Sequence, residues 1–176
     1  QLSGSGSFTR AVFGGFRTPS ITDTIEYTQF DTTGNCADFG NLTQARSYLD
    51  DGSAGNNTRA LWTCGSNGAQ YNVIDYVTIA TTGNATDFGN ASATKYSVAS
   101  TSNTTRCVIA GGYHPSWRDE IDFIEISTTG NSTDFGDILS NTQSMMAASS
   151  LTRACFAGGN VAPSSTDQNV IQSIEL

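Results

Sequence analysis

The residues of this chain best suited to nucleophilic or metal chemistry are its one histidine and its four cysteines. His114 stands in a loop without a nucleophile signature, so the sequence offers no Ser-His-Asp unit. Cys36, Cys64, Cys107 and Cys155 lack the Cys-x-x-Cys spacing typical of zinc sites. We therefore expect no metal site, no cofactor, and four free cysteines that pack as small core residues.

The acidic residues leave one further catalytic option, the carboxylate pair of a glycoside hydrolase. The chain has 16 Asp and Glu residues. Many of them recur along the chain, such as Asp38, Asp87 and Asp134, and others alternate on expected strands, such as Asp75 and Asp122. No asymmetric pair stands out, so we expect a protein that is not an enzyme.

Four near-copies of one segment make up the chain. Each copy opens with Thr-Arg, at intervals of 47 to 49 residues, and the first three continue with Thr-Thr-Gly-Asn and then Asp-Phe-Gly. Repeats of this period are typical of arrays of small units that bury their apolar faces only against one another. We expect a single domain, 1–176, with repeats at about 9–57, 58–104, 105–151 and an incomplete 152–176.

The second copy shows what one repeat contains. Apolar and β-branched residues fill 59–65 and 73–80, and shorter stretches at 86–89 and 96–100 have the same character, with turn residues between them. No segment has a sustained period of 3.6 residues. The pattern predicts an all-β fold of short antiparallel strands, about four per repeat, with helices nearly absent.

These repeats resemble kelch repeats, the four-stranded blades of one class of β-propeller. The resemblance rests on Gly-Gly at 14–15, 111–112 and 158–159, two aromatic positions, and a basic residue before the next inner strand. The aromatic and basic residues are Tyr27, Tyr76, Phe123, Phe39, Phe88, Phe135, Arg46 and Lys95. The chain departs from the pattern at Cys64, at Thr142 in place of the third basic residue, and in having phenylalanine where kelch repeats have tryptophan.

The resemblance implies a β-propeller of about four blades, closed either by strand complementation between the termini or by a second chain. The Thr-Thr-Gly-Asn-x-Thr-Asp-Phe-Gly variant is also similar to propeller repeats in virion proteins of marine bacteriophages. Some kelch propellers are copper oxidases, but one histidine cannot supply their His and Tyr ligands. The chain begins at Gln1, and 170–176 is expected to be the third strand of a blade, which is compatible with a processed or excised piece.

Residues that recur in each repeat are expected to be structural. The recurring residues are Arg10, Arg59, Arg106, Arg153, Asp38, Asp87, Asp134, Phe39, Phe88 and Phe135. We expect the arginines and aspartates to tie neighbouring strands or blades through charge-assisted hydrogen bonds, with an anion-binding ring of arginines as the alternative. We expect the phenylalanines to pack between blades rather than to stack on sugars.

The loop after each Gly-Gly differs from copy to copy and is the best candidate for function. In kelch-like propellers these loops share one face. The candidate binding residues are Arg17, Tyr71, Tyr113, His114, Trp117 and Arg118. They offer ring faces and hydrogen-bonding groups suited to a carbohydrate or a protein. A self-packed loop or an assembly contact is the alternative.

Composition limits the partners. The net charge is −8 with a pI near 4.3, and Lys95 is the only lysine, so we expect no nucleic-acid partner. No apolar run reaches the roughly 18 residues of a spanning helix, so we expect no membrane insertion. The Thr/Asn/Gly-rich composition favours an extracellular or virion location. The Asn-x-Ser/Thr sequences would be glycan acceptors in a secreted eukaryotic protein, or they arise from composition alone. They begin at Asn41, Asn56, Asn84, Asn90, Asn103 and Asn131.

These patterns favour a non-enzymatic β-propeller that acts as a structural or host-recognition module, on a phage virion such as its tail or fibre. Its partners would be other proteins or further copies of itself. The alternative is a secreted lectin-like protein that binds a cell-surface glycan with the variable loops of one propeller face.

Overall fold

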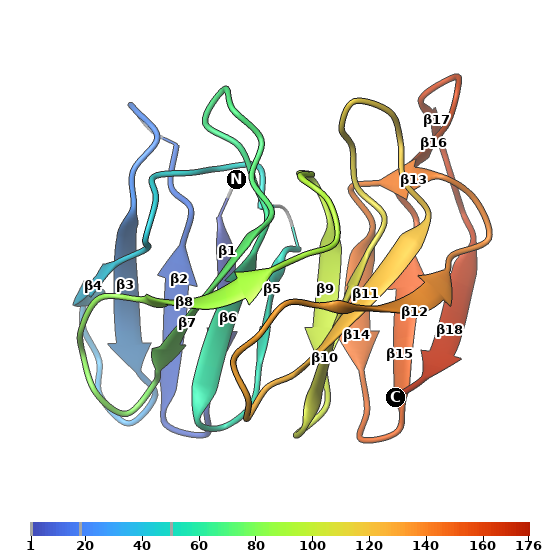
Figure 1. The fold of residues 1–176 in the computed structure, drawn as a ribbon. Helices are drawn as coiled ribbons and strands as arrows, with labels where there is room; N and C mark the ends of the chain where they lie inside the picture. The colour runs from blue at the N-terminus through green and yellow to red at the C-terminus, as the bar shows by residue number, and fades with distance from the viewer. Residues whose placement is uncertain (1, 18, 50) are drawn as a thin grey trace.

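The computed structural model describes residues 2–17, 19–49 and 51–176, and it confirms the prediction of an all-β fold. No helix occurs among these residues. Three antiparallel four-stranded sheets follow one another along the chain, and a fourth sheet has three strands. Figure 1 shows the four sheets side by side in chain order.

The first three sheets have the same strand order and nearly the same lengths. The first consists of β1 (Ser3–Gly6), β2 (Arg10–Gly14), β3 (Thr24–Gln29) and β4 (Ala37–Asn41). The second consists of β5 (Ser53–Gly55), β6 (Arg59–Thr63), β7 (Val73–Thr78) and β8 (Thr86–Asn90). The third consists of β9 (Ala99–Ser102), β10 (Arg106–Ala110), β11 (Glu120–Glu125) and β12 (Thr133–Asp137).

The fourth sheet stops one strand earlier. It consists of β14 (Met146–Ser149), β15 (Arg153–Ala157) and β18 (Ile171–Glu175). Between β15 and β18 the chain makes a hairpin of β16 (Asn160–Val161) and β17 (Thr166–Asp167), which pairs with β13 (Thr142–Gln143) as a small separate sheet. β18 therefore has one free edge in the fourth sheet.

Neighbouring sheets meet along their innermost strands. β1 packs beside β5, β5 beside β9, and β9 beside β14. Closure through the termini, one of the two expected alternatives, is not found in the described part of the chain, because β1 pairs with β2 and β18 with β15. The contacts thus run from the first sheet to the fourth without forming a closed ring among these residues.

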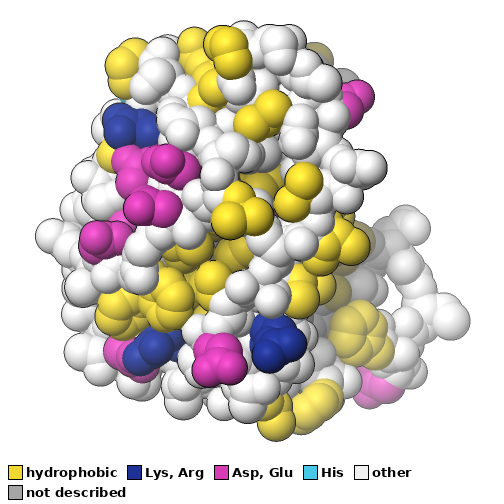
Figure 2. All heavy atoms as spheres, turned by 90° about the vertical axis from the view of Figure 1, so that its right-hand side faces the viewer, with side chains coloured by type: hydrophobic (Ala, Val, Ile, Leu, Met, Phe, Trp, Pro, Cys, Tyr) yellow, Lys and Arg dark blue, Asp and Glu magenta, His cyan; other side chains and the backbone are white. Residues whose placement is uncertain are grey.

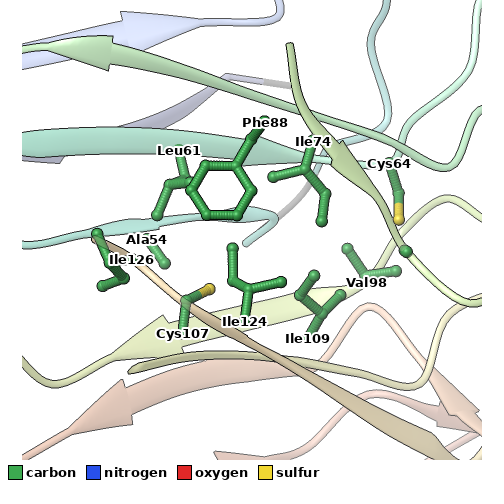
Figure 3. Packing of buried hydrophobic residues seen from close by; sticks show 11 residues of the cluster. Ala54, Leu61, Cys64, Ile74, Phe88, Val98, Cys107, Ile109, Ile124 and Ile126 are labelled. Carbon is green, nitrogen blue, oxygen red and sulfur yellow. The ribbon is translucent and has the colours of Figure 1, made fainter. Parts of the chain in front are cut away.

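The space between each two sheets is filled by its own hydrophobic cluster. Between the first and second sheets, Val12 and Ile25 meet Trp62 and Ile79, and all four are at most 1% exposed. Figure 3 shows the cluster between the second and third sheets, where Phe88 points toward residues such as Ile124. Alternation along the strands sends every second side chain toward one neighbour, so each middle sheet is apolar on both faces.

The Thr-Thr-Gly-Asn turns join the sheets at their outer edge. The N–H of Gly83 donates to the carbonyl of Phe39 at 2.8 Å, and the N–H of Gly130 donates to the carbonyl of Phe88 at 2.7 Å. At the second of these joins the contact is close, since a Cβ on Gly89 would lie 2.2 Å from the carbonyl oxygen of Gly130. Only glycine fits at position 89, and Gly40, Gly89 and Gly136 share a positive φ of 137° to 148°, which favours glycine in the recurring Asp-Phe-Gly.

Candidate binding face

The variable loops lie at one end of the sheets. They connect the second and third strands of each sheet, at 15–23, 64–72, 111–119 and 158–170. In Figure 1 they stand together at the top of the molecule, while the tight hairpins that carry Thr-Arg lie at the bottom. The four sheets therefore present loops of different sequence at the same end of the molecule.

A row of aromatic side chains crosses this end from the first sheet toward the third. The guanidinium of Arg17 lies 4.7 Å from the ring centre of Tyr48. The ring centres of Tyr48 and Tyr96 are 5.6 Å apart, as are those of Tyr96 and Tyr113, and Trp117 continues the row at 6.4 Å from Tyr113. We call these five residues the aromatic row. Tilted and edge-on ring pairs at these separations attract each other.

Backbone pairing holds the centre of the aromatic row in place. The N–H of Tyr96 donates to the carbonyl of Tyr113 at 3.2 Å, and the reverse bond is 2.9 Å long. Tyr113 also forms a bridge with Trp117. The second sheet has the same backbone pattern, in which Ser66 bridges to both Ser47 and Gln70. Since small polar residues satisfy that pattern, the fold does not require aromatic side chains here.

The side chains of the aromatic row are partly solvated. A hollow of about 370 Å³ lies beside Arg17, Tyr48 and Tyr96 and is also lined by Asn67 and Gln70. Loss of solvation raises the pKa of the Tyr96 hydroxyl above its usual value, and the neighbouring Tyr113 and Tyr48 add to the effect. Arg17 donates a hydrogen bond to the hydroxyl of Tyr48, which orders an otherwise exposed guanidinium.

Three of the predicted binding residues lie outside the aromatic row. The hydroxyl of Tyr71 donates to Oδ1 of Asn67 at 3.0 Å. The Nδ1 of His114 lies 3.3 Å from the Thr94 hydroxyl. Arg118 forms an ion pair with Glu120 at 2.9 Å and donates to the carbonyl of His114 at 3.1 Å. These residues make local contacts within their loops or with the adjacent segment.

Tyr48 and Tyr96 are the two members of the aromatic row that the sequence analysis missed. Both precede an innermost strand and follow a buried basic residue, Arg46 or Lys95. Tyr48 has a φ of 55°, and Ser97 has a φ of 54° in the equivalent turn, so the two tyrosines occupy different positions of the repeat. Tyr48 follows Arg46 by two residues and Tyr96 follows Lys95 directly, so no shared repeat position marks the two tyrosines in the sequence.

The recurring arginines behave in two ways. Arg10 donates to the carbonyl of Ile79 at 3.0 Å and Arg59 to that of Ile126 at 2.6 Å, so both bridge to the next sheet. Arg106 instead pairs with Glu125 at 3.0 Å. Arg10, Arg59 and Arg106 all lie over an aromatic ring of their own sheet, 4.6 to 4.7 Å from its centre. Arg153 is 59% exposed and lies 4.0 Å from Glu175.

Two of the three recurring aspartates accept a hydrogen bond within their own strand. Asp87 accepts from the N–H of Gly89, and Asp134 accepts from the N–H of Gly136. Asp38 is exposed. Each recurring phenylalanine packs edge-on against an aromatic residue of its own sheet. The pairs are Tyr27 with Phe39, Tyr76 with Phe88 and Phe123 with Phe135.

The four cysteines are all free. Cys64 and Cys107 are buried, Cys155 is half-buried and Cys36 is exposed, so the expectation that all four lie in the core is wrong for Cys36. Among the described residues, no three His, Cys, Asp or Glu side chains are grouped so that they could hold a metal ion. The same part of the chain contains no helix long and apolar enough to span a membrane.

Comparison with known proteins adds no relative. No protein-family model matches this chain, and no curated protein sequence matches it. The kelch resemblance therefore stays a prediction that rests on the repeat motif itself.

Proposed function

We propose that this chain is a non-enzymatic β-propeller module that recognises a partner through its loop-bearing end. The aromatic row carries this proposal. It is specific to one part of the array, and the equivalent backbone of the second sheet is built with Ser47, Ser66 and Gln70. A feature that the fold does not require, placed on a solvated surface, is a candidate for binding.

The propeller assignment is supported by how the sheets are packed. Each sheet has its strands in chain order from the innermost outward, and the innermost strands of neighbouring sheets pack side by side in series. This is the arrangement of propeller blades about a central axis. The four sheets would form a sector of such a ring.

The chemistry of the aromatic row suits a carbohydrate or a polar protein surface. Tyrosine rings offer apolar faces to the C–H groups of a sugar, and their hydroxyls offer hydrogen bonds. Asn67 and Gln70 add amide groups at the rim of the hollow beside Arg17. A lectin-like role is therefore the second candidate function, and the same residues would serve it.

We propose that this module has a structural or host-recognition role on a phage virion, in a tail or fibre. That setting rests on the similarity of the Thr-Thr-Gly-Asn-x-Thr-Asp-Phe-Gly repeat to phage virion repeats. An extracellular or virion surface also suits a chain with a net charge of −8 and one lysine.

The test is a binding screen of the intact chain against a glycan array and against bacterial cell surfaces. Trp117→Ala removes the end of the aromatic row, and we expect it to weaken binding by about 2 kcal/mol, roughly thirtyfold. Leu151→Ala is the matched control, because Leu151 is exposed in a Thr-Arg hairpin at the opposite end of the sheets. Binding that survives Trp117→Ala and is lost with Leu151→Ala would contradict the proposed surface.

A further inference from the structure

The first sheet exposes a side chain at a position that the middle sheets bury. Phe30 is 60% exposed, whereas Ile79 is 1% and Ile126 is 0% exposed. The three positions are equivalent, because the N–H of each residue donates to the carbonyl of the threonine that opens its Thr-Arg pair. In the second and third sheets this position packs against the preceding sheet. Among the described residues, no sheet packs on this face of the first sheet.

The fourth sheet exposes a different position at the opposite end. Ile171 is 75% exposed, whereas Ile25, Ile74 and Ile121 are 0%, 0% and 1% exposed. Each of these residues pairs with the last residue of the second strand of its sheet, so the register is the same. Met146 of β14, 67% exposed, adds to the same face. Figure 2 looks onto this side of the molecule and shows hydrophobic side chains gathered across it.

The two bare faces are of opposite kinds. Every interface within the chain joins the face of one sheet that carries the Ile25 position to the face of the next sheet that carries the Phe30 position. The first sheet leaves the face with the Phe30 position open. A hollow of about 380 Å³ on that face is lined by Leu2, Ala11, Phe13 and Phe30. The fourth sheet leaves open the face with the Ile25 position, where it carries Ile171. The chain therefore carries both halves of an interface that it already builds three times.

We propose that a second copy of this chain docks head-to-tail, with its first sheet against the fourth sheet of the copy before it. Such a contact continues the established packing of sheet against sheet and covers Phe30 of one copy and Ile171 of the other. The contact joins unlike faces, so further copies either close a ring or extend a filament. It does not depend on the proposed binding surface, which lies at the loop-bearing end of the sheets.

The structure also indicates which forces would hold the copies together. The fourth sheet has three strands among the described residues, and these three strands make the contact. Arg153 faces Glu175 as Arg106 faces Glu125, and Arg106 makes no hydrogen bond to the next sheet among the described contacts. We therefore assign the contact to apolar packing rather than to arginine hydrogen bonds, and it is expected to be weaker than the interfaces within the chain.

The test uses two variants, Phe30→Asp and Ile171→Asp, and measures native mass by light scattering over a concentration series. The wild type is expected to self-associate. A charge buried without a partner weakens the contact about a hundredfold or more, so each variant alone is expected to be monomeric. A mixture of the two variants has one intact face of each kind and is expected to form a one-to-one dimer that grows no further.

Leu151→Asp is the matched control. Leu151 is 71% exposed, but it lies at a hairpin tip where the second and third sheets have Asn57 and Thr104, outside both faces. This variant is expected to associate like the wild type, and far-ultraviolet circular dichroism shows whether all variants are folded. A wild type that is monomeric at every concentration overturns the proposal. So does association that either variant retains alone, since that would join like faces or a different surface.

Discussion

A buried ion pair lies where the first sheet joins the second, and an equivalent pair lies where the second joins the third. Arg46 and Asp75 are both fully buried and lie 2.7 Å apart. Asp75 also accepts from the N–H and the hydroxyl of Thr43, at 3.0 Å and 2.6 Å. These additional hydrogen bonds offset part of the cost of removing both charges from water. Lys95 and Asp122 repeat the pair at 3.0 Å at the next join.

At the join between the third and fourth sheets, uncharged residues stand at both positions of this ion pair. Thr142 stands at the position of Arg46 and Lys95, and Gln172 stands in the register of Asp75 and Asp122. The amide oxygen of Gln172 accepts from the N–H of Leu139 at 2.8 Å. Replacing one partner alone would leave an unpaired buried charge, which costs about 3–5 kcal/mol. The departure from the kelch pattern at Thr142 is thus compensated on the facing strand.

The two buried thiols give a prediction for stability at alkaline pH. Burial raises the pKa of Cys64 from 9.0 to about 11, and burial raises that of Cys107 from 9.0 to about 12. Above pH 9 the unfolded chain loses these protons while the folded chain keeps them, so the free energy of unfolding falls as pH rises through this range. The loss is on the order of 3 kcal/mol per thiol. Urea unfolding in reductant from pH 8 to 11 measures it.

The control for this prediction separates the thiols from tyrosine ionisation. Cys64→Ala and Cys107→Ala each should flatten the alkaline decline, whereas Cys36→Ala should leave it unchanged because that side chain is exposed. An equal slope in the wild type and in all three variants would show that the thiols are not the cause.

At the scale of the element, the turn of the next sheet determines how completely the phenylalanine on each outer strand is buried. Phe88 on β8 is 2% exposed, because the turn of the third sheet covers it. Phe135 on β12 is half-buried, and a Cβ on Gly136 would meet no atom within 4 Å, because the fourth sheet ends before the corresponding turn. The same strand therefore has different surroundings in the two sheets.

This difference predicts unequal costs for one substitution. Phe88→Ala removes a fully packed ring and should lower the free energy of unfolding by about 3–5 kcal/mol. Phe135→Ala should cost markedly less, because part of that ring already contacts solvent. Chemical denaturation of both variants measures the difference. Equal costs would mean that the turn segment does not contribute to packing the ring.

Most strands could be predicted from the sequence, because the apolar pattern and the glycine pairs recur with the repeat. The innermost strands were harder. β5, Ser53–Gly55, has only small residues, and the stretch expected at 96–100 begins as a strand only at Ala99. Tyr96 therefore lies in the connection before β9, where it joins the aromatic row. That row depends on contacts between loops of different sheets, and no local pattern in the chain encodes them.

At the scale of the whole molecule, a series of equivalent interfaces leaves two ends that differ from the middle. Sheets in such an array are stabilised by their neighbours, so the first and fourth sheets have one apolar face fewer in contact than the others. The chain also has a net charge of −8, and copies that approach one another repel. Apolar attraction and charge repulsion thus oppose each other in head-to-tail association.

Salt separates these two forces and gives the last prediction. Raising sodium chloride from about 0.05 M to about 0.5 M shortens the screening length to well below the roughly 10 Å found at 0.1 M, so repulsion between acidic copies is screened while apolar packing is retained. Association of the wild type should therefore strengthen with salt in sedimentation velocity experiments. Ile171→Asp should stay monomeric at both concentrations, because screening does not restore the lost packing. Association that weakens with salt would show that ion pairs, rather than the faces of Phe30 and Ile171, hold the copies together.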